Sequence, residues 1–172
     1  ERELKLLEQN MMIREVSIHD DQTGLLNRRG FKSLLPKRIE IARRHKEHIA
    51  VCYYDLDNLK RINDLLGHDA GDKVIENFAH ALKSSHRQTD VVTRFGGDEF
   101  LAFVFMNDKE EIKQVELRLQ AELNTQNPPE MIQYSVGVFI IDNKDLVNLD
   151  VAKVISQADK RMYKIKHQKK YK

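Results

Sequence analysis

The first stretch of the chain, residues 1–18, has a hydrophobic pattern that indicates a helix. It contains no Gly or Pro, and its apolar positions alternate with charged residues. The apolar positions that recur at roughly heptad spacing are Leu4, Leu7, Met11 and Ile18. Because Arg14 stands at the next core-like position, the repeat is imperfect. Two readings stay open: a surface helix packed on its own domain, and a signalling helix that forms a dimer.

The rest of the chain, after a polar link over 19–27, alternates between helical periodicity and short β-branched or aromatic runs. We expect Pro36 to bend or reset the first helix and Pro128–Pro129 to break the chain. The expected elements are helices over 28–46, 69–83, 109–123 and 151–166, and strands over 49–54, 91–95, 100–105 and 131–141. Strand 49–54 is apolar on both faces, which suits a central position in a sheet.

The order of these elements predicts the fold class. After the lead helices it runs strand, helix, strand, strand, helix, strand, helix, which is the βαββαβ arrangement of ferredoxin-like or palm folds. We therefore expect an α+β domain, an α/β sandwich whose central antiparallel sheet is flanked by helices. The second and third strands are joined by Gly96-Gly97-Asp98-Glu99, which has the composition of a tight hairpin turn.

Composition narrows the class of protein. A chain of 172 residues with 41% hydrophobic and 33% charged content fits one soluble domain, and a net charge of +2 gives no reason to expect a nucleic-acid partner. The single cysteine, Cys52, is expected to be a buried strand residue, which fits a reducing cytoplasm. No apolar run is long enough to span a bilayer.

The beginning of the sequence suggests a fragment of a longer protein. It starts with Glu1 in the middle of a helical pattern. We therefore expect 1–18 to be a signalling or linker helix, 19–172 to be the catalytic domain, and a sensory domain to lie upstream. Any membrane anchor of the full-length protein is expected in that upstream part.

Two acidic clusters dominate the polar residues, one after the first strand and one in the hairpin turn. The first holds Asp55 and Asp57, and the second holds Asp98 and Glu99. In a βαββ sheet the first strand can lie beside the hairpin, so these carboxylates can converge. Carboxylate oxygens suit Mg²⁺, which makes metal-assisted phosphoryl transfer the natural reaction class. The alternative is that these acids merely end a strand and decorate a turn.

The segment from Asn63 to Asp72 offers a second candidate region. Asp69 or a neighbour can cap the following helix, and a helix start near Lys60 and Arg61 suits phosphate oxygens. The alternative is an ordinary capped loop between helices.

With these residues assembled, the chain resembles the GGDEF diguanylate cyclase family over roughly Asp20 to Lys166. Residues 20–29 follow the family pattern D-x-L-T-G-L-x-N-R-R except at Gln22, and the signature is intact as Arg94-Phe95-Gly96-Gly97-Asp98-Glu99-Phe100. Residues 55–64 and the Gly67-His68 to Gly71-Asp72 segment complete four ordered motifs at family-like spacing. Gln22 and Leu59 replace the usual Leu and Phe, which we interpret as packing changes.

The resemblance implies a condensation of two GTP molecules into cyclic di-GMP with Mg²⁺, for which Mn²⁺ can substitute. It implies that Asp55 and Asp98, with the Leu56 carbonyl, hold the metal. Glu99 is then nearest the reacting 3′-hydroxyl, as proton acceptor, metal ligand or positioning group, while Gly96 and Gly97 admit the nucleotide.

Substrate contacts follow from the same resemblance. Asn63 and Asp72 are expected to read the guanine base, since a carboxylate accepts from the N1 and N2 donors of guanine. Lys60, Lys166 and Lys170 are expected to contact phosphate. Lys170 stands where the family has arginine, so a plain solvated helix end is its alternative.

Arg87-Gln88-Thr89-Asp90 matches the R-x-x-D inhibitory site of the family, which implies that Arg87 and Asp90 bind the product. The alternative is a salt bridge at a helix end. The resemblance further implies a homodimer in which two domains face each other. A catalytically silent nucleotide receptor and a purely structural module are the competing functions, and the intact acids argue against both.

Overall fold

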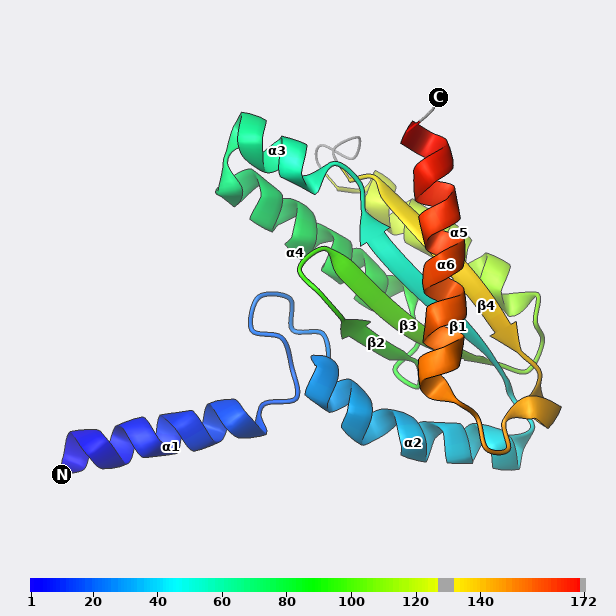
Figure 1. Cartoon of the computed structure of the whole chain (residues 1–172), viewed down its shortest axis with the longest axis horizontal. Coiled ribbons are helices and arrows are strands. Elements are labelled where there is room, and N and C mark those ends of the chain that lie inside the picture. Colours follow the sequence, from blue (N-terminus) through cyan, green and yellow to red (C-terminus); the bar gives the residue numbers. More distant parts are fainter. Residues whose placement is uncertain (127–131, 171–172) are drawn as a thin grey trace.

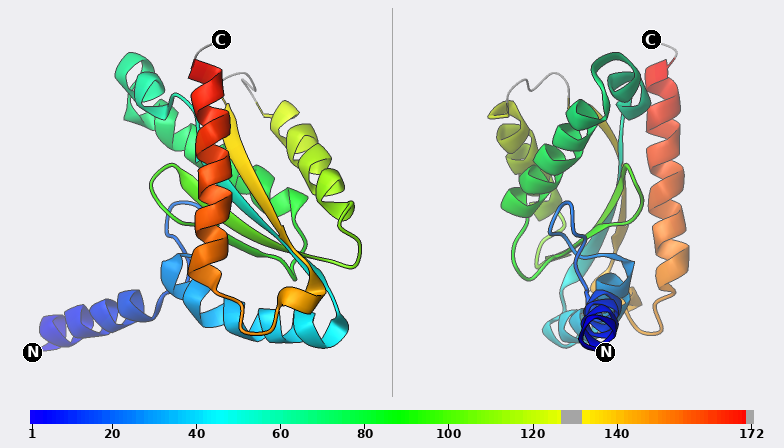
Figure 2. Two further views of the ribbon diagram at one scale, coloured as in Figure 1. Left: turned by 45° about the vertical axis from the view of Figure 1, so that its right-hand side comes forward. Right: turned by 90° about the vertical axis from the view of Figure 1, so that its left-hand side faces the viewer.

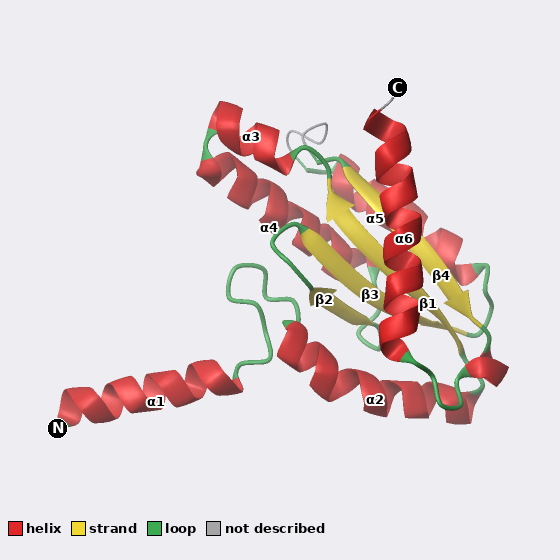
Figure 3. Cartoon of the chain, viewed as in Figure 1, coloured by secondary structure: helices red, strands yellow, loops and turns green. Residues whose placement is uncertain are grey.

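The computed structural model describes residues 1–126 and 132–170. Its elements are α1 (Arg2–Val16), α2 (Arg28–His45), β1 (His48–Leu56), α3 (Leu59–Leu66), α4 (His68–Ser85), β2 (Val91–Arg94), β3 (Glu99–Met106), α5 (Glu111–Asn124), β4 (Tyr134–Ile141), a 3-10 turn (Asn143–Asp145) and α6 (Val151–Lys170) (Figure 3). Pro128, Pro129 and Met131, on which a predicted chain break and a strand start depend, lie outside the described residues.

The described residues form a four-stranded sheet in the order β2-β3-β1-β4 with antiparallel neighbours. This is the arrangement predicted from the element order, and it confirms the α+β fold class. The hydrophobic run of β1 places it between β3 and β4, where both its edges are paired.

Helices cover both faces of the sheet (Figures 1 and 2). On one face, Cys52 and Tyr54 of β1 pack with Phe78 of α4 and with α5. On the other, Val51 and Tyr53 pack with α2 and α6. Successive strand residues point to opposite faces, so one strand supplies two cores. The prediction that Cys52 is buried in a strand is confirmed, and burial raises the pKa of its thiol to about 12.

Three local predictions were wrong or incomplete. Helix α3 was not predicted, because it is only eight residues long and none of its residues is buried. Helix α4 begins at His68 after Gly67, whose φ of 90° makes the turn, and no side chain caps it, so Asp69 is not a cap. Helix α2 runs on through Pro36 without being reset.

Helix α1 projects away from the sheet and its helices (Figure 1). Its apolar side chains from Leu4 to Ile13 are exposed, among them Leu7 and Met11, each more than 60% exposed. The prediction that this helix packs on its own domain is therefore wrong. Within the described residues, no helix is long and apolar enough to cross a bilayer.

The junction between α1 and the domain is tied down by Asn27. Its side-chain oxygen accepts from the Gly30 backbone N–H and caps α2. Its side-chain nitrogen donates to the carbonyls of Ser17 and His19. Next to it, the Leu26 carbonyl accepts from the Arg94 backbone N–H at 2.9 Å, which connects this segment to β2.

Helix α6 lies against β4 at a point where a side chain has no room. A Cβ on Gly137 would stand 2.0 Å from the Ala158 carbonyl oxygen and 2.2 Å from the Met162 nitrogen. Both are backbone atoms of a helix, so neither can move without moving α6.

We predict that Gly137→Ala destabilises the domain by about 1–3 kcal/mol, because overpacking pushes α6 off the sheet. The melting temperature should fall by roughly 2–4 °C for each kcal/mol in a domain of this size. Gly97→Ala is the matched control, since a Cβ there meets no atom within 4 Å. Equal melting temperatures for Gly137→Ala and the unmodified domain would contradict the close contact.

Candidate functional site

The two acidic clusters predicted from the sequence lie at one end of the β1–β3 pair. Asp55 stands opposite Glu99 in the strand register. The Asp98 carbonyl accepts from the Leu56 backbone N–H at 2.9 Å, which fixes the hairpin turn against the end of β1. The expected convergence is therefore present, with Asp55 and Leu56 inside the strand instead of after it.

Asp55 carries its charge in an unfavourable environment. It is 9% exposed, and burial raises the pKa of its carboxyl to about 6, an effect that neighbouring Asp98 and Glu99 increase and Lys166 opposes. The Lys166 ammonium lies 2.9 Å from Asp55 Oδ1. That contact is an ion pair without the geometry of a directed hydrogen bond.

Asp57, two residues further along, is buried and well supplied with donors. The Ser135 hydroxyl donates to both of its carboxylate oxygens, at 2.9 and 3.2 Å. The Lys169 ammonium donates to Oδ2 at 2.9 Å and also to the Tyr134 carbonyl. Asp57 therefore fastens α6 and the start of β4 to the end of β1.

A cavity of about 730 Å³ opens beside these carboxylates, between α3 and the end of α6. It is rich in positive charge, and Leu56, Asp57 and Asp98 also line it. The basic residues that line it are Lys60, Arg61, Lys166, Lys169 and Lys170. The predicted phosphate residues Lys60, Lys166 and Lys170 thus come together with Leu56 and Asp98.

Asn63 and Asp72 lie apart from this cavity, where α3 meets α4. Asn63 packs over Gly71, since a Cβ on that glycine would stand 1.7 Å from Asn63 Oδ1. This oxygen is buried and accepts no hydrogen bond. Asp72 is exposed, and its Oδ1 accepts from Gln22 Nε2 at 3.1 Å.

Gln22 corrects an interpretation made from the sequence. The sequence predicts a packing change where Gln22 replaces the family leucine, but the Gln22 side chain is exposed and hydrogen-bonded. Besides donating to Asp72, it accepts from Arg94 Nη1 at 2.7 Å. Leucine can do neither.

The hairpin glycines differ in their surroundings. A Cβ on Gly96 would stand 2.8 Å from Glu99 Oε2, so the missing side chain leaves room for that carboxylate. Gly97 faces open space. Arg28 of α2 holds the preceding residue, because its Nε donates to the Phe95 carbonyl at 2.7 Å.

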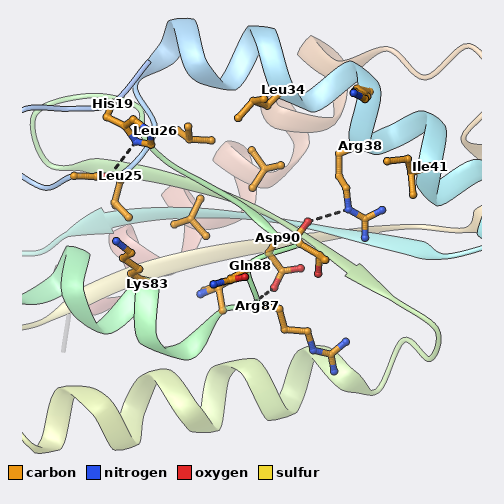
Figure 4. Close-up of a pocket in the computed structure, with 16 residues that line it drawn as sticks. His19, Leu25, Leu26, Leu34, Arg38, Ile41, Lys83, Arg87, Gln88 and Asp90 are labelled. Atoms are coloured by element: carbon orange, nitrogen blue, oxygen red, sulfur yellow. Dashed lines mark hydrogen bonds between the residues drawn. The ribbon is translucent and has the colours of Figure 1, made fainter. Parts of the chain in front are cut away.

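Arg87 and Asp90 lie elsewhere, at the mouth of a cavity of about 600 Å³ bounded by α2, the end of α4 and β2 (Figure 4). The Asp90 carboxylate is buried and accepts from the backbone N–H groups of Arg87 and Phe105. The Arg87 side chain points away from it and pairs with Glu111 at 3.0 Å, with 55% of the arginine side chain exposed.

In the described part of the chain, no three His, Cys, Asp or Glu side chains converge into a closed metal cage. What the site offers is Asp55, a nearby Asp98 and a strand-end carbonyl. Mg²⁺ commonly takes one or two carboxylates and completes its shell with water and substrate phosphates. The oxygen donors present fit such a partly open site, where burial and then the nearby carboxylates of Asp98 and Glu99 raise the pKa of Asp55.

Comparison with known proteins settles the family. The model of the GGDEF domain, described as diguanylate cyclase, matches residues 17–172. The chain belongs to the GGDEF family. The resemblance drawn from its motifs is thereby confirmed.

Individual relatives agree with this. The probable diguanylate cyclase DgcC of Escherichia coli K12 is 36% identical over 138 residues, which are 78% of this chain and 37% of that protein. The cyclic di-GMP phosphodiesterase NbdA of Pseudomonas aeruginosa is 36% identical over 111 residues, 64% of this chain and 14% of that protein. The match thus spans well under half the length of each of these two relatives.

A solved structure of a microbial GGDEF domain with cyclic di-GMP has a TM-score of 0.73 and 30% identity to this chain. The structural match covers 88% of this chain and 94% of the chain in that structure. The antiparallel sheet and flanking helices described above are therefore those of a GGDEF domain.

The sequence interpretation missed two residues of the site that the structure brings forward, Lys169 and Arg94. Lys169 lies one turn after Lys166, and residues three apart share a helix face, so its proximity to the acids was accessible from spacing. Arg94, whose Nη2 donates to the Gly97 carbonyl at 2.8 Å, stands in the signature itself and was not given a role.

The charge of Asp55 generates a stability prediction for the metal-free domain. Because its folded-state pKa of about 6 lies above the ordinary 3.8, ionised Asp55 disfavours folding. This penalty is absent below about pH 4 and complete above about pH 6. Asp55→Asn should therefore stabilise the domain at neutral pH by on the order of 1 kcal/mol after solvent screening, and by nothing near pH 4.

The measurement is urea unfolding with a chelator at both pH values. Asp57→Asn is the matched control, and it should destabilise the domain at neutral pH because Asp57 is ion-paired with Lys169. Destabilisation by Asp55→Asn at neutral pH would show that Lys166 outweighs the repulsion.

Proposed function

We propose that this chain is the catalytic domain of a diguanylate cyclase, which condenses two GTP into cyclic di-GMP and releases pyrophosphate. The observation that carries the proposal is the pairing of Asp55 with Glu99 across β1 and β3, beside a lysine-lined cavity. An acidic pair next to a basic cavity suits a metal-dependent reaction on a triphosphate. The intact signature of a GGDEF domain supports it.

The divalent metal is assigned to Asp55, Asp98 and the Leu56 carbonyl, with Glu99 adjoining. Mg²⁺, for which Mn²⁺ can substitute, would neutralise phosphate charge there and make the 3′-hydroxyl easier to deprotonate. Glu99 is the carboxylate assigned to the attacking hydroxyl. Its side chain has room because residue 96 is glycine.

Binding of GTP is divided between two regions. Lys60, Lys166 and Lys170 are assigned to the phosphates, since all three line the basic cavity. Asn63 and Asp72 are assigned to guanine. The Asp72 carboxylate can accept from the N1 and N2 donors of guanine, and the Asn63 amide nitrogen can donate to an acceptor on the ring.

A symmetric product needs two domains that face each other, so we assign catalysis to a homodimer with two-fold symmetry. The exposed apolar residues of α1 are suited to pairing with a second copy. Because the free thiol of buried Cys52 fits a reducing compartment, the domain is assigned to the cytoplasm.

A second candidate function is a catalytically silent nucleotide receptor. The observation that favours it is the similarity to a phosphodiesterase, in which the matching region is 14% of the protein's length. The two functions separate on incubation with GTP and Mg²⁺ followed by nucleotide chromatography. A cyclase releases cyclic di-GMP and pyrophosphate, whereas a receptor returns GTP unchanged.

We predict that Asp98→Ala lowers cyclase turnover by more than about a hundredfold, because loss of a metal carboxylate removes several kcal/mol of transition-state stabilisation. Asp145→Ala, an exposed acid in the 3-10 turn, is the control and should keep full activity. Circular dichroism checks that both variants are folded. Full turnover in folded Asp98→Ala would remove the metal assignment.

Arg87 and Asp90 are assigned to product inhibition. Asp90 is held in place by two backbone N–H groups, while the Arg87 guanidinium is accessible. A solved GGDEF domain 30% identical to this chain has been seen with cyclic di-GMP. A ligand bound here would hold domains apart without competing for GTP.

Arg87→Ala should weaken cyclic di-GMP binding by about ten- to a hundredfold, as expected for loss of a charge-assisted hydrogen-bonding pair. Calorimetry with cyclic di-GMP measures this directly, and inhibition of turnover by added product should weaken in parallel. The control is Arg44→Ala, because Arg44 is likewise an exposed arginine but lies on α2. If the unmodified domain binds no cyclic di-GMP, Arg87 and Asp90 are an ordinary surface pair.

A further inference from the structure

Gln22 joins two parts of the molecule that are far apart in the sequence. Its Nε2 donates to Asp72 Oδ1 on α4 at 3.1 Å, and its Oε1 accepts from Arg94 Nη1 at the end of β2 at 2.7 Å. The donor end of the amide faces a carboxylate and the acceptor end faces a guanidinium. This is the orientation in which both partners are satisfied.

Arg94 continues the connection into the hairpin turn. Its Nε and Nη2 donate to the Gly97 carbonyl at 3.3 and 2.8 Å. Its Nη1 also reaches Asp20 Oδ2 at 3.1 Å. The arginine is therefore fixed at three acceptors, and it holds the turn that carries Asp98 and Glu99.

Asp20 gives this connection a rigid base. Its Oδ2 accepts from the backbone N–H and the hydroxyl of Thr23, at 2.9 and 2.7 Å. Burial raises the pKa of Asp20, but the hydrogen bonds from Thr23 and Arg94 outweigh burial, and the pKa lies below its ordinary value. The ionised carboxylate thus anchors the loop that presents Gln22.

Asp72 lacks comparable support from its own helix. It is exposed near the start of α4, where no side chain caps the helix. A carboxylate that reads a base by two parallel hydrogen bonds must be held in one rotamer, and the Gln22 amide supplies a fixed donor for this. The bond leaves lone pairs on both oxygens for a ligand.

We propose that Gln22 is a positioning residue that couples the base-reading carboxylate Asp72 to the hairpin turn through Arg94, and so sets the preference for guanine. This rests on the proposed cyclase function and on the assignment of Asp72 to guanine. The family leucine at this position has no hydrogen-bonding group, so the coupling is a property of this chain.

The test compares Gln22→Leu, which restores the family residue, with Gln22→Glu. Substrates are GTP and inosine triphosphate, which lacks only the 2-amino group. For Gln22→Leu we expect the KM for GTP to rise about three- to tenfold, the range for one hydrogen bond. The preference for GTP over inosine triphosphate should fall by a similar factor, while kcat changes less than KM.

Gln22→Glu separates the two halves of the bridge. It keeps an acceptor for Arg94 but places a negative charge beside Asp72. It should lose base preference at least as strongly as Gln22→Leu while retaining kcat. Gln120→Leu, the same change at an exposed position of α5, is the matched control and should leave both substrates unaffected.

A double-mutant cycle shows whether Gln22 acts through Asp72. In an Asp72→Ala background, Gln22→Leu should have no further effect on the KM for GTP, because the positioned group is gone. Additive effects would overturn the coupling, as would a Gln22→Leu domain with unchanged KM and base preference. An unmodified domain that neither binds GTP in calorimetry nor converts it would overturn the proposed function, and the coupling with it.

Discussion

The antiparallel pairing of β1 with β3 is the constraint on which the rest of the structure depends. Its register sets Asp55 against Glu99, and one backbone hydrogen bond from Leu56 to Asp98 holds the turn in line with the strand end. A shift by one residue would move these carboxylates to opposite faces of the sheet. The tightly buried residues of β1, packed on both faces, make such a shift costly.

Concentrating acids in this way leaves charge that the fold has to offset. Helix α6 does this with two lysines one turn apart, Lys166 against Asp55 and Lys169 against Asp57. The helix can bring them there because Gly137 lets its backbone lie directly on β4. The electrostatics at one end of α6 and the packing in its middle are therefore parts of one arrangement.

The sequence was sufficient for the elements that have strong periodicity. The strand over 49–54, the helix over 69–83 and the hairpin around Gly96 were all predicted, because each buries a regular pattern of apolar residues. Helix α3 escaped prediction, since none of its residues is buried and its entry at Asn58 needs a left-handed backbone.

Side-chain partners were harder to foresee than elements. The hydrogen bonds of Gln22 to Asp72 and Arg94 span 50 and 72 residues. No local pattern encodes them, because they depend on how loops and helix ends settle on the finished sheet. The carboxylate cluster was foreseeable, since strand pairing alone brings it together.

The hydrogen bonds of Asn27 and Leu26 connect the segment that follows α1 to the rest of the domain. Asn27 clamps Ser17 and His19, at the end of the lead segment, to the first turn of α2, and the neighbouring Leu26 is bonded to the last residue of β2. The residues that directly follow helix α1 are therefore hydrogen-bonded to the domain. These hydrogen bonds form a continuous connection from the residues after α1 to Arg94, which donates to the Gly97 carbonyl in the hairpin turn.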